Sequence, residues 1–259
     1  MPEKLGETLK RRKALVVFLT VGDPLTWDGR VMDALASGGV DAYELGIPTR
    51  LAKYDGPSIR TSYRRALRSG VDERCAMSLI KQVKGLINPI LFTYYEVALE
   101  CGLEDLVNSA AEADIRCVLF PDLLIDYPES LEDYIRICKK YNLEHAFFVT
   151  SCFPHHLIVK LAKLEPSFIY LGLMATTGIP LPLAINRNIK IIKNLVGETP
   201  LLVGFAIDNP QQVSLCINAG ADGVVVGSAI LKILEGGFEA AKLKSFVTGL
   251  KDALLGRSY

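Results

Sequence analysis

The chain has 259 residues, half of them hydrophobic, so it is long enough to bury one large core. Lysine and arginine together number 29, as do aspartate and glutamate, which makes the formal net charge zero. Without a basic excess or a long block of like charge, we expect neither nucleic acid nor an anionic membrane surface as a partner.

The first twenty residues lack the layout of a signal peptide, because their apolar run is short and leads directly into polar Val-Gly-Asp-Pro. No apolar stretch approaches the roughly 18 residues of a membrane-spanning helix. The six cysteines are scattered without a Cys-x-x-Cys pair, which is typical of small buried side chains rather than of a disulfide framework. We therefore expect a cytoplasmic protein.

Short apolar runs alternate with amphipathic stretches along the whole chain. The apolar runs are rich in Val, Ile, Leu, Phe or Tyr, which favours strands covered on both faces. Eight such strands are predicted, at 14–20, 41–47, 88–95, 115–120, 145–151, 167–174, 200–206 and 222–228. The clearest helices between them are predicted at 28–39, 103–114, 131–142 and 209–221, several with the Asp, Asn or Gly of capped ends.

This alternation predicts an α/β protein with parallel strands and right-handed crossovers. Eight units without a linker-like segment favour one closed (β/α)8 barrel domain, a TIM barrel, over residues 1–259; an open doubly wound sheet is the alternative. A first helix at 2–12 precedes the first strand and is expected to cap the barrel floor. In such barrels the active residues lie at the carboxyl ends of the strands and in the loops that follow.

Glu44 lies inside the second predicted strand, where residues 42, 44 and 46 share one face. If that face points into the barrel, burial raises the pKa of Glu44. A carboxyl group with a raised pKa can both donate and accept a proton near neutral pH, as general acid–base catalysis requires. The alternative is an acid that pairs with a buried Lys or Arg, or that faces water at the strand end. The residues alone favour neither.

Asp55 stands in the next loop, directly before Gly56-Pro57 and a helix predicted from Ser58 onward. Aspartate is common both in turns and at the starts of helices. The residues alone therefore favour a structural role for Asp55 over a catalytic one.

The last two predicted strands lead through turns of small residues into helices, at 204–212 and 226–234. Free backbone N–H groups and the positive end of a helix favour a phosphate, and barrels bind phosphate after strands seven and eight. Two such turns favour a phosphate site over turns that are merely tight. The Gly/Thr/Pro-rich loop at 174–182 is expected to be a lid or a third phosphate contact.

Cys152, His155 and His156 lie close together in the sequence Ser-Cys-Phe-Pro-His-His. A zinc site needs three or four converging ligands, and no fourth ligand stands at a recognisable spacing. Pro154 is typical of a helix start, so both histidines are expected in the first turn of a surface helix. We predict no metal site.

Seven segments, in their order along the chain, resemble the tryptophan synthase alpha subunit family. They are FLTVGDP (18–24), ELGIP and DGPSI (44–59), FTYYE (92–96), LFPDLL (119–124), TTG (176–178), GFAIDNPQQV (204–213) and GADGVVVGSAILK (220–232). The resemblance extends from the first strand to the eighth. It implies a (β/α)8 lyase of tryptophan biosynthesis that cleaves indole-3-glycerol phosphate to indole and glyceraldehyde 3-phosphate in a retro-aldol reaction without a cofactor.

The resemblance also implies roles for single residues. Glu44 matches the catalytic glutamate that moves a proton during cleavage, and Asp55 matches the aspartate that binds the indole N–H and stabilises the cationic indolenine. Tyr170 matches a tyrosine beside the reacting glycerol carbons. Phe18 and Leu119 match apolar residues that line the indole pocket, Tyr94 an aromatic residue on its floor, and Thr177 the lid threonine that orients the catalytic aspartate. Phosphate contacts are implied for Gly178, Ala206, Gly227 and Ser228.

The family pairs with a beta subunit that holds pyridoxal phosphate, so the resemblance implies an alpha2beta2-type complex. The loop at 49–54 departs from the family's usual sequence, although it keeps the spacing to Asp55. In the family this loop contacts the beta subunit, and Glu96 replaces an asparagine at another subunit-facing position. Arg50 or Lys53 is placed to pair with Asp55 and alter its role.

Two further departures lie in the lid and in the seventh-strand turn. Met174 and Ala175 alter the lid, and Ala206 replaces a glycine where a methyl group is tolerated only at negative φ. Two alternatives to the lyase therefore remain. One is a stand-alone or repurposed barrel acting on another sugar phosphate; the other is a non-catalytic regulator of a beta subunit, which the retained Glu44 and Asp55 disfavour.

Overall fold

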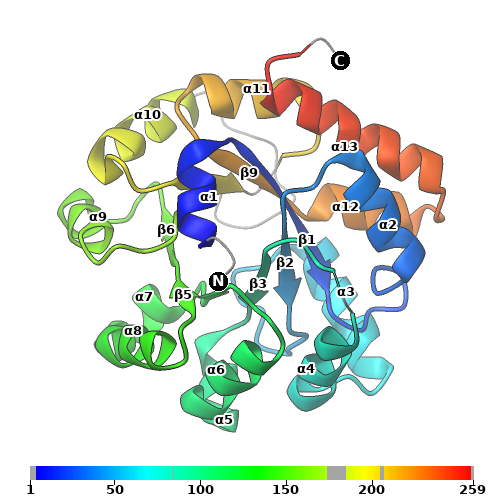
Figure 1. Cartoon of the computed structure of the whole chain (residues 1–259), viewed down its shortest axis with the longest axis horizontal. Coiled ribbons are helices and arrows are strands. Elements are labelled where there is room, and N and C mark those ends of the chain that lie inside the picture. Colours follow the sequence, from blue (N-terminus) through cyan, green and yellow to red (C-terminus); the bar gives the residue numbers. More distant parts are fainter. Residues whose placement is uncertain (1–3, 84, 174–184, 205–206, 258–259) are drawn as a thin grey trace.

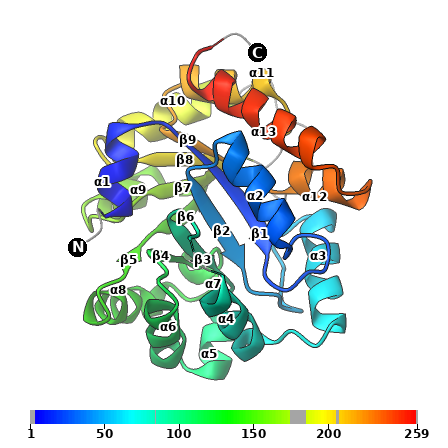
Figure 2. The ribbon, with the colours of Figure 1, turned by 45° about the vertical axis from the view of Figure 1, so that its right-hand side comes forward.

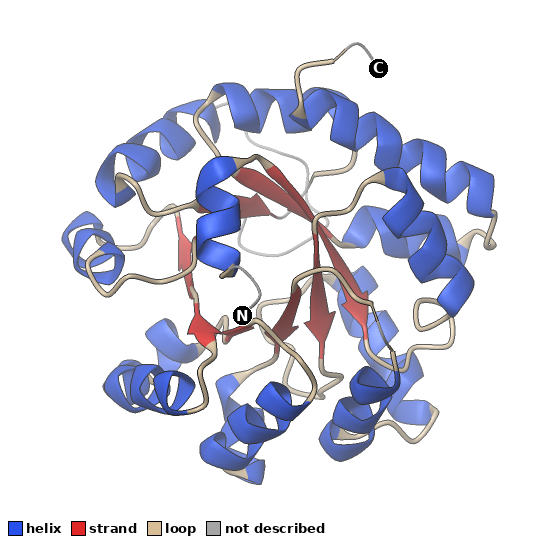
Figure 3. Ribbon diagram, viewed as in Figure 1, coloured by secondary structure: helices blue, strands red, loops and turns tan. Residues whose placement is uncertain are grey.

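A computed structural model of the protein describes residues 4–83, 85–173, 185–204 and 207–257. Its strands form one parallel sheet with the order β5-β4-β3-β2-β1-β9-β8-β7-β6, and helices surround this sheet on the outside (Figures 1 and 3). The strands are β1 (Ala14–Thr20), β2 (Ala42–Gly46), β3 (Pro89–Phe92), β4 (Cys117–Leu119), β5 (Glu144–His145), β6 (Phe147–Thr150), β7 (Ile169–Gly172), β8 (Leu201–Gly204) and β9 (Gly223–Val226).

The two edges of this sheet, β5 and β6, are separated by a single residue, Ala146. The N–H of Ala146 donates to the carbonyl of Val118 in β4 at 3.2 Å, whereas the N–H of Phe147 donates to the carbonyl of Phe168, just before β7, at 3.4 Å. The chain itself therefore joins the two edges into a nearly closed barrel. The predicted α/β barrel is confirmed, with its fifth strand divided into two short pieces.

The helices whose bounds were predicted are present and agree with the prediction to within three residues at each end. The helices of the structure are α1 (Leu5–Arg11), α2 (Gly29–Gly38), α3 (Pro57–Arg68), α4 (Glu73–Gln82), α5 (Tyr95–Cys101), α6 (Leu103–Glu112), α7 (Leu123–Asp126), the 3-10 turn η1 (Pro128–Ser130), α8 (Leu131–Lys140), α9 (His155–Ala162), α10 (Ile185–Val196), α11 (Pro210–Asn218), α12 (Ser228–Glu235) and α13 (Ala240–Leu254). The side chains of Asp28 and Asn209 cap α2 and α11 by accepting backbone N–H groups. Among the described residues, none of the helices has both the length and the apolar character of a membrane span.

Alternate residues of the strands serve two different cores. Odd-numbered residues of β1 and β2, such as Leu15 and Leu45, belong to the large cluster between sheet and helices. Even-numbered ones, such as Val16, Phe18 and Ala42, belong to a second cluster inside the barrel. The even face of β2, and with it Glu44, therefore points inward.

Helix α1 lies across one end of the barrel (Figures 1 and 2). The N–H groups of Leu5 and Gly6 donate to the carboxylate of Glu144 at 2.6 and 3.0 Å, and Leu5 and Leu9 pack into the interior cluster. Because Glu144 stands at the start of β5, α1 closes the amino-terminal end of the strands. The predicted capping helix is confirmed, and the opposite end is left for the site.

Candidate active site

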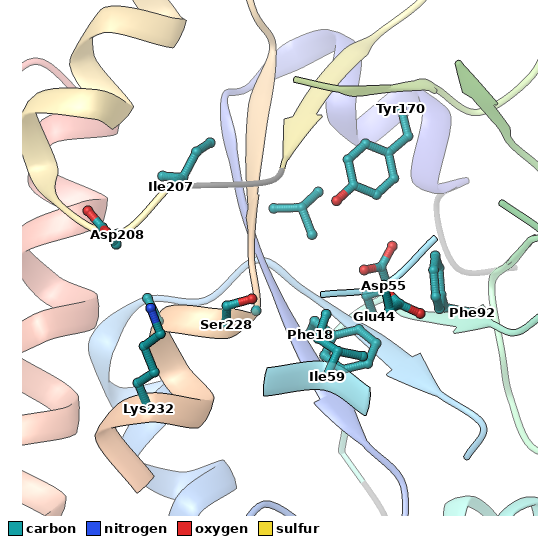
Figure 4. A pocket seen from close by; sticks show the side chains of 13 residues that line it. Phe18, Glu44, Asp55, Ile59, Phe92, Tyr170, Ile207, Asp208, Ser228 and Lys232 are labelled. Carbon is teal, nitrogen blue, oxygen red and sulfur yellow. The ribbon is translucent and has the colours of Figure 1, made fainter. Parts of the chain in front are cut away.

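A cavity lies at the carboxyl ends of the strands and gathers residues from distant parts of the chain (Figure 4). Its wall combines three carboxylates, several aromatic rings and the start of α12. The lining residues are Phe18, Glu44, Asp55, Ile59, Phe92, Tyr170, Ile207, Asp208, Val225, Gly227, Ser228, Ala229 and Lys232.

Glu44 projects from β2 into this cavity and is only 3 % exposed. Burial, and then the nearby charge of Asp55, raise the pKa of Glu44 to about 8. No described Lys or Arg forms an ion pair with Glu44. Glu44 is therefore buried without an ion-pair partner among the described residues, and the expected rise in its pKa is confirmed.

Asp55 reaches the same cavity from the loop between β2 and α3 and is also 3 % exposed. Burial raises the pKa of Asp55 to about 6, and the hydroxyl of Tyr94, which donates to Oδ2 at 2.9 Å, limits the rise. Helix α3 has Gly56 as its N-cap and no side-chain cap. The helix-start role that the residues alone favoured for Asp55 is therefore wrong, because its side chain turns into the cavity instead.

The two acids differ in protonation state near neutral pH. A pKa of about 8 leaves Glu44 mostly protonated at pH 7, and a pKa of about 6 leaves Asp55 mostly ionised. A pair of carboxyl groups whose pKa values differ in this way is typical of an acid/base site with divided roles. The cavity thus offers a proton donor and a fixed negative charge side by side.

Tyr170, on β7, forms another part of the cavity wall, and its ring meets the ring of Phe148 edge-on at 5.4 Å. Burial, and then the charges of Glu44 and Asp55, raise the pKa of Tyr170 well above its ordinary value, so the phenol keeps its proton. Its hydroxyl lies over Gly204 in β8, where a Cβ atom would stand 2.1 Å away. Only glycine at 204 leaves room for this position of the ring.

The predicted phosphate residue Ser228 stands on the other side of the cavity from Glu44 and Asp55 (Figure 4), and its neighbour Gly227 also lines the cavity. Gly227 is the N-cap of α12, and no side chain caps this helix. The hydroxyl of Ser228 is buried and has no hydrogen-bond partner among the described residues. A buried unpaired hydroxyl beside free N–H groups at a helix start is suited to an anion.

The remaining predicted site residues fall into three groups. Phe18 lines the cavity and meets Phe92 edge-on at 5.8 Å. Tyr94 and Leu119 are fully buried but do not line it: Tyr94 stands behind Asp55, and Leu119 belongs to the barrel interior. Their substrate contacts stay predictions. The other three, in the lid and in the seventh-strand turn, lie outside the described residues: Thr177, Gly178 and Ala206.

Neither cation that the sequence placed near Asp55 pairs with it. Lys53 instead lies 2.8 Å from Asp126 and 3.4 Å from Glu96, and Arg50 is exposed without an ion pair to any described residue. The positive charge that acts on Asp55 belongs to Arg60.

The histidine cluster lies away from this site. His155 and His156 are exposed at the start of α9, directly after its N-cap Pro154, as expected. Over the described ranges, no group of three or more His, Cys, Asp or Glu side chains is arranged to hold a metal ion.

Sequence reasoning missed several lining residues, among them Phe92, Asp208 and Lys232. Lys232 follows Ser228 by four positions in α12, so both side chains stand on one face of the helix. That spacing was a readable signal for a cation beside the phosphate site. Phe92 was readable as the last inward residue of β3, whereas Asp208 gave no comparable signal.

Comparison with known proteins gives a consistent result. A family model described as "Tryptophan synthase alpha chain" matches residues 6–253. Curated tryptophan synthase alpha chains from Saccharolobus solfataricus and Pyropia yezoensis are 35% and 31% identical, over 86% and 96% of this chain and 89% and 97% of their own lengths.

Among solved structures, a mutant tryptophan synthase alpha-subunit from Pyrococcus furiosus is 26% identical with a TM-score of 0.79 and covers 95% of this chain and 99% of its own. A chain of tryptophan synthase from M. tuberculosis in an aminoacrylate-bound form shares the fold, with a TM-score of 0.82 and 22% identity over 97% of this chain and 100% of its own. On the matching family model and on the identity and coverage of these relatives, the chain belongs to the tryptophan synthase alpha chain family.

Proposed function

We propose that this protein is a tryptophan synthase alpha chain that cleaves indole-3-glycerol phosphate into indole and glyceraldehyde 3-phosphate in tryptophan biosynthesis. Family membership supports the reaction. One observation carries the assignment of steps to residues: Glu44 and Asp55 share a buried cavity with different pKa values and stand across it from the start of α12.

The reaction breaks the bond between C3 of the indole ring and the hydroxyl-bearing glycerol carbon. The ring carbon must gain a proton, the hydroxyl must lose one, and the electron pair of the broken bond returns to the ring. Glu44, protonated at neutral pH, gives its proton to the ring carbon. The resulting carboxylate takes the hydroxyl proton as the aldehyde forms, which restores Glu44 for the next cycle.

Asp55 stabilises the charge that this first step creates. Protonation at the ring carbon leaves positive charge on the ring nitrogen, and an ionised carboxylate that accepts the N–H hydrogen bond opposes it. The hydroxyl of Tyr94 keeps one carboxylate oxygen in place from behind. Because the site is buried, this attraction is stronger than it would be in water.

The rest of the substrate follows the length of the cavity. Phe18 and Phe92 provide an apolar surface for the indole, and Tyr170 stands where it can donate a hydrogen bond to the glycerol portion. Gly227 and Ser228 receive the phosphate, with Lys232 one helical turn further on. Thr177, Gly178 and Ala206 remain our proposed lid and phosphate contacts.

The family also suggests the context in which the chain works. We propose that it acts in the cytoplasm as one barrel domain and joins a beta subunit, which holds the pyridoxal phosphate, in an alpha2beta2-type complex. The alpha chain itself needs no cofactor for the proposed proton transfers. A test for partner effects is to repeat the assay below with a cognate beta subunit present.

The test is indole release from indole-3-glycerol phosphate by the purified chain and by Glu44→Gln and Asp55→Asn variants. We expect each variant to lose about a hundredfold to ten-thousandfold in kcat, the usual contribution of general acid–base groups. Glu100→Gln, an exposed acid on α5, is the matched control and should behave like wild type. If the Glu44→Gln variant is as active as wild type, Glu44 has no part in the mechanism. If the wild-type protein is inactive both with and without a beta subunit, the substrate is to be sought among other sugar phosphates.

A further inference from the structure

The loop between β2 and α3 carries Asp55, and hydrogen bonds hold its backbone from two sides. Arg60, in α3, donates to the carbonyls of Ala52 and Lys53, each at 2.8 Å. The N–H of Tyr54 donates to the hydroxyl of Tyr94 at 2.9 Å, and that same hydroxyl donates to Asp55. A shift of the backbone at 53–54 is therefore transmitted to the Asp55 carboxylate through one shared hydroxyl group.

The side chain of Lys53 connects this loop to two neighbouring elements. Its Nζ lies 2.8 Å from Oδ2 of Asp126, at the end of α7, and 3.4 Å from Oε1 of Glu96, in α5. The hydroxyls of Tyr54 and Tyr127 donate to Asp126 at 3.0 Å and to Glu96 at 2.9 Å. We call these five residues the Lys53 cluster: Lys53, Tyr54, Glu96, Asp126 and Tyr127.

Aromatic contacts complete the cluster. The ammonium group of Lys53 lies 5.9 Å from the ring centre of Tyr54 and 5.8 Å from that of Tyr127, within the range of cation–π attraction. The ring of Tyr54 also stacks on that of Tyr94, at 6.3 Å and 9°. Lys53 thus contacts residues that follow β2, β3 and β4, three adjacent strands of the barrel.

The partial exposure of the Lys53 cluster limits its contribution to stability. The side chains of Lys53, Glu96 and Asp126 are 37%, 29% and 29% exposed. Partly exposed ion pairs contribute only about 0–1 kcal/mol each, so the cluster adds little to global stability. Catalysis is far more sensitive to position, since a displacement of about 1 Å can cost roughly a hundredfold in rate.

We propose that Lys53 is a positioning residue of this enzyme: by joining Glu96 and Asp126, it fixes the loop that presents Asp55 to the cavity. This inference rests on the proposed function only for its kinetic consequence. The anchoring itself involves contacts within one chain.

The kinetic test compares Lys53→Met with Arg50→Met. Both remove a cation from the same loop, but Arg50 makes no ion pair with a described residue, so it is the matched control. We expect Lys53→Met to lower kcat about tenfold to a hundredfold while the inhibition constant of inorganic phosphate stays unchanged, because the phosphate site lies across the cavity. Lys53→Arg, which can pair with both acids, should recover most of the activity.

A second readout needs no substrate and so separates this inference from the proposed reaction. Hydrogen exchange of the Tyr54 amide, bonded to Tyr94, should be at least tenfold faster in Lys53→Met than in Arg50→Met, with the melting temperature nearly unchanged. Equal exchange in the two variants overturns the proposal even if the enzyme is active. Faster exchange with unchanged kcat would also overturn it, because the loop would then move without consequence for Asp55.

Discussion

At the level of single residues, the site depends on glycines, whose lack of a side chain leaves room for aromatic rings. A Cβ atom at Gly46 would stand 2.5 Å from the ring of Phe18, and one at Gly204 would stand 2.1 Å from the hydroxyl of Tyr170. Neither glycine has positive φ, so contact alone explains the requirement for glycine. The aromatic rings of the cavity wall therefore pack directly against the strand backbone.

This arrangement predicts the effect of Gly204→Ala. The added methyl group has to displace the ring of Tyr170, and overpacking of this kind costs about 1–3 kcal/mol. If Tyr170 acts beside the reacting carbons as proposed, we expect kcat for indole release to fall about tenfold or more when its ring is displaced. The control is Gly29→Ala, where no atom lies within 4 Å of the new methyl group. Unchanged kcat in Gly204→Ala would show that the position of Tyr170 does not matter to the reaction.

At the scale of elements, α12 contributes both backbone and side-chain groups to one end of the cavity. Its free N–H groups, the unpaired hydroxyl of Ser228 and the cation of Lys232 all stand at or within one turn of its start. The helix dipole adds a partial positive charge at the same place. The helix is therefore suited to hold the phosphate, while β2 and the loop after it carry the two acids proposed to react.

The contribution of Ser228 can be measured separately from the chemistry. Ser228→Ala removes one hydrogen bond to a charged group, worth about 1.5–3 kcal/mol, so we expect KM to rise roughly tenfold or more with kcat nearly unchanged. The inhibition constant of inorganic phosphate should rise by the same factor. Ser214→Ala, on α11, is the control, since this hydroxyl lies outside the cavity and donates to the carbonyl of Ala253. A drop in kcat with constant KM would place Ser228 in the chemical step instead.

At the scale of the whole molecule, the two acids make folding depend on pH. Burial raises the folded-state pKa of Glu44 from 4.5 to about 8 and that of Asp55 from 3.8 to about 6. The folded state therefore binds these protons more strongly than the unfolded state does. The unfolding free energy should fall as pH rises, between about pH 4 and 6 through Asp55 and between about pH 4.5 and 8 through Glu44.

Glu44→Gln should remove the larger part of this dependence. Glutamine cannot ionise, so the variant should match wild type near pH 4 and exceed it in unfolding free energy at pH 8, by an amount of the order of a few kcal/mol. Urea unfolding at several pH values measures the difference. A constant offset between the two proteins across this range would contradict a raised pKa for Glu44, because only a titrating group makes the offset grow.

The residues alone favoured a barrel over an open sheet, and they predicted which strand face Glu44 occupies without deciding its role. Apolar runs in regular alternation with amphipathic stretches predict parallel strands covered by helices, and strand alternation predicts that residue 44 shares the inner face with 42 and 46. These patterns are local, because each follows from which side chains must leave water. The motifs before and after Asp55 carried the resemblance to the family. That resemblance implied the catalytic role of Asp55, whereas its residue type and position alone favoured a structural role.

The environment of Asp55 and the partners of Lys53 depend on contacts between distant parts of the chain. Tyr94, Glu96 and Asp126 stand 39 to 73 positions further along the chain than these two residues, and closure of the barrel is what brings them together. The same closure divides the fifth strand at Ala146 and sets α12 across the cavity from the acids. Burial and partner choice depend on distances between loops, and those distances exist only once all the strands have paired around the barrel.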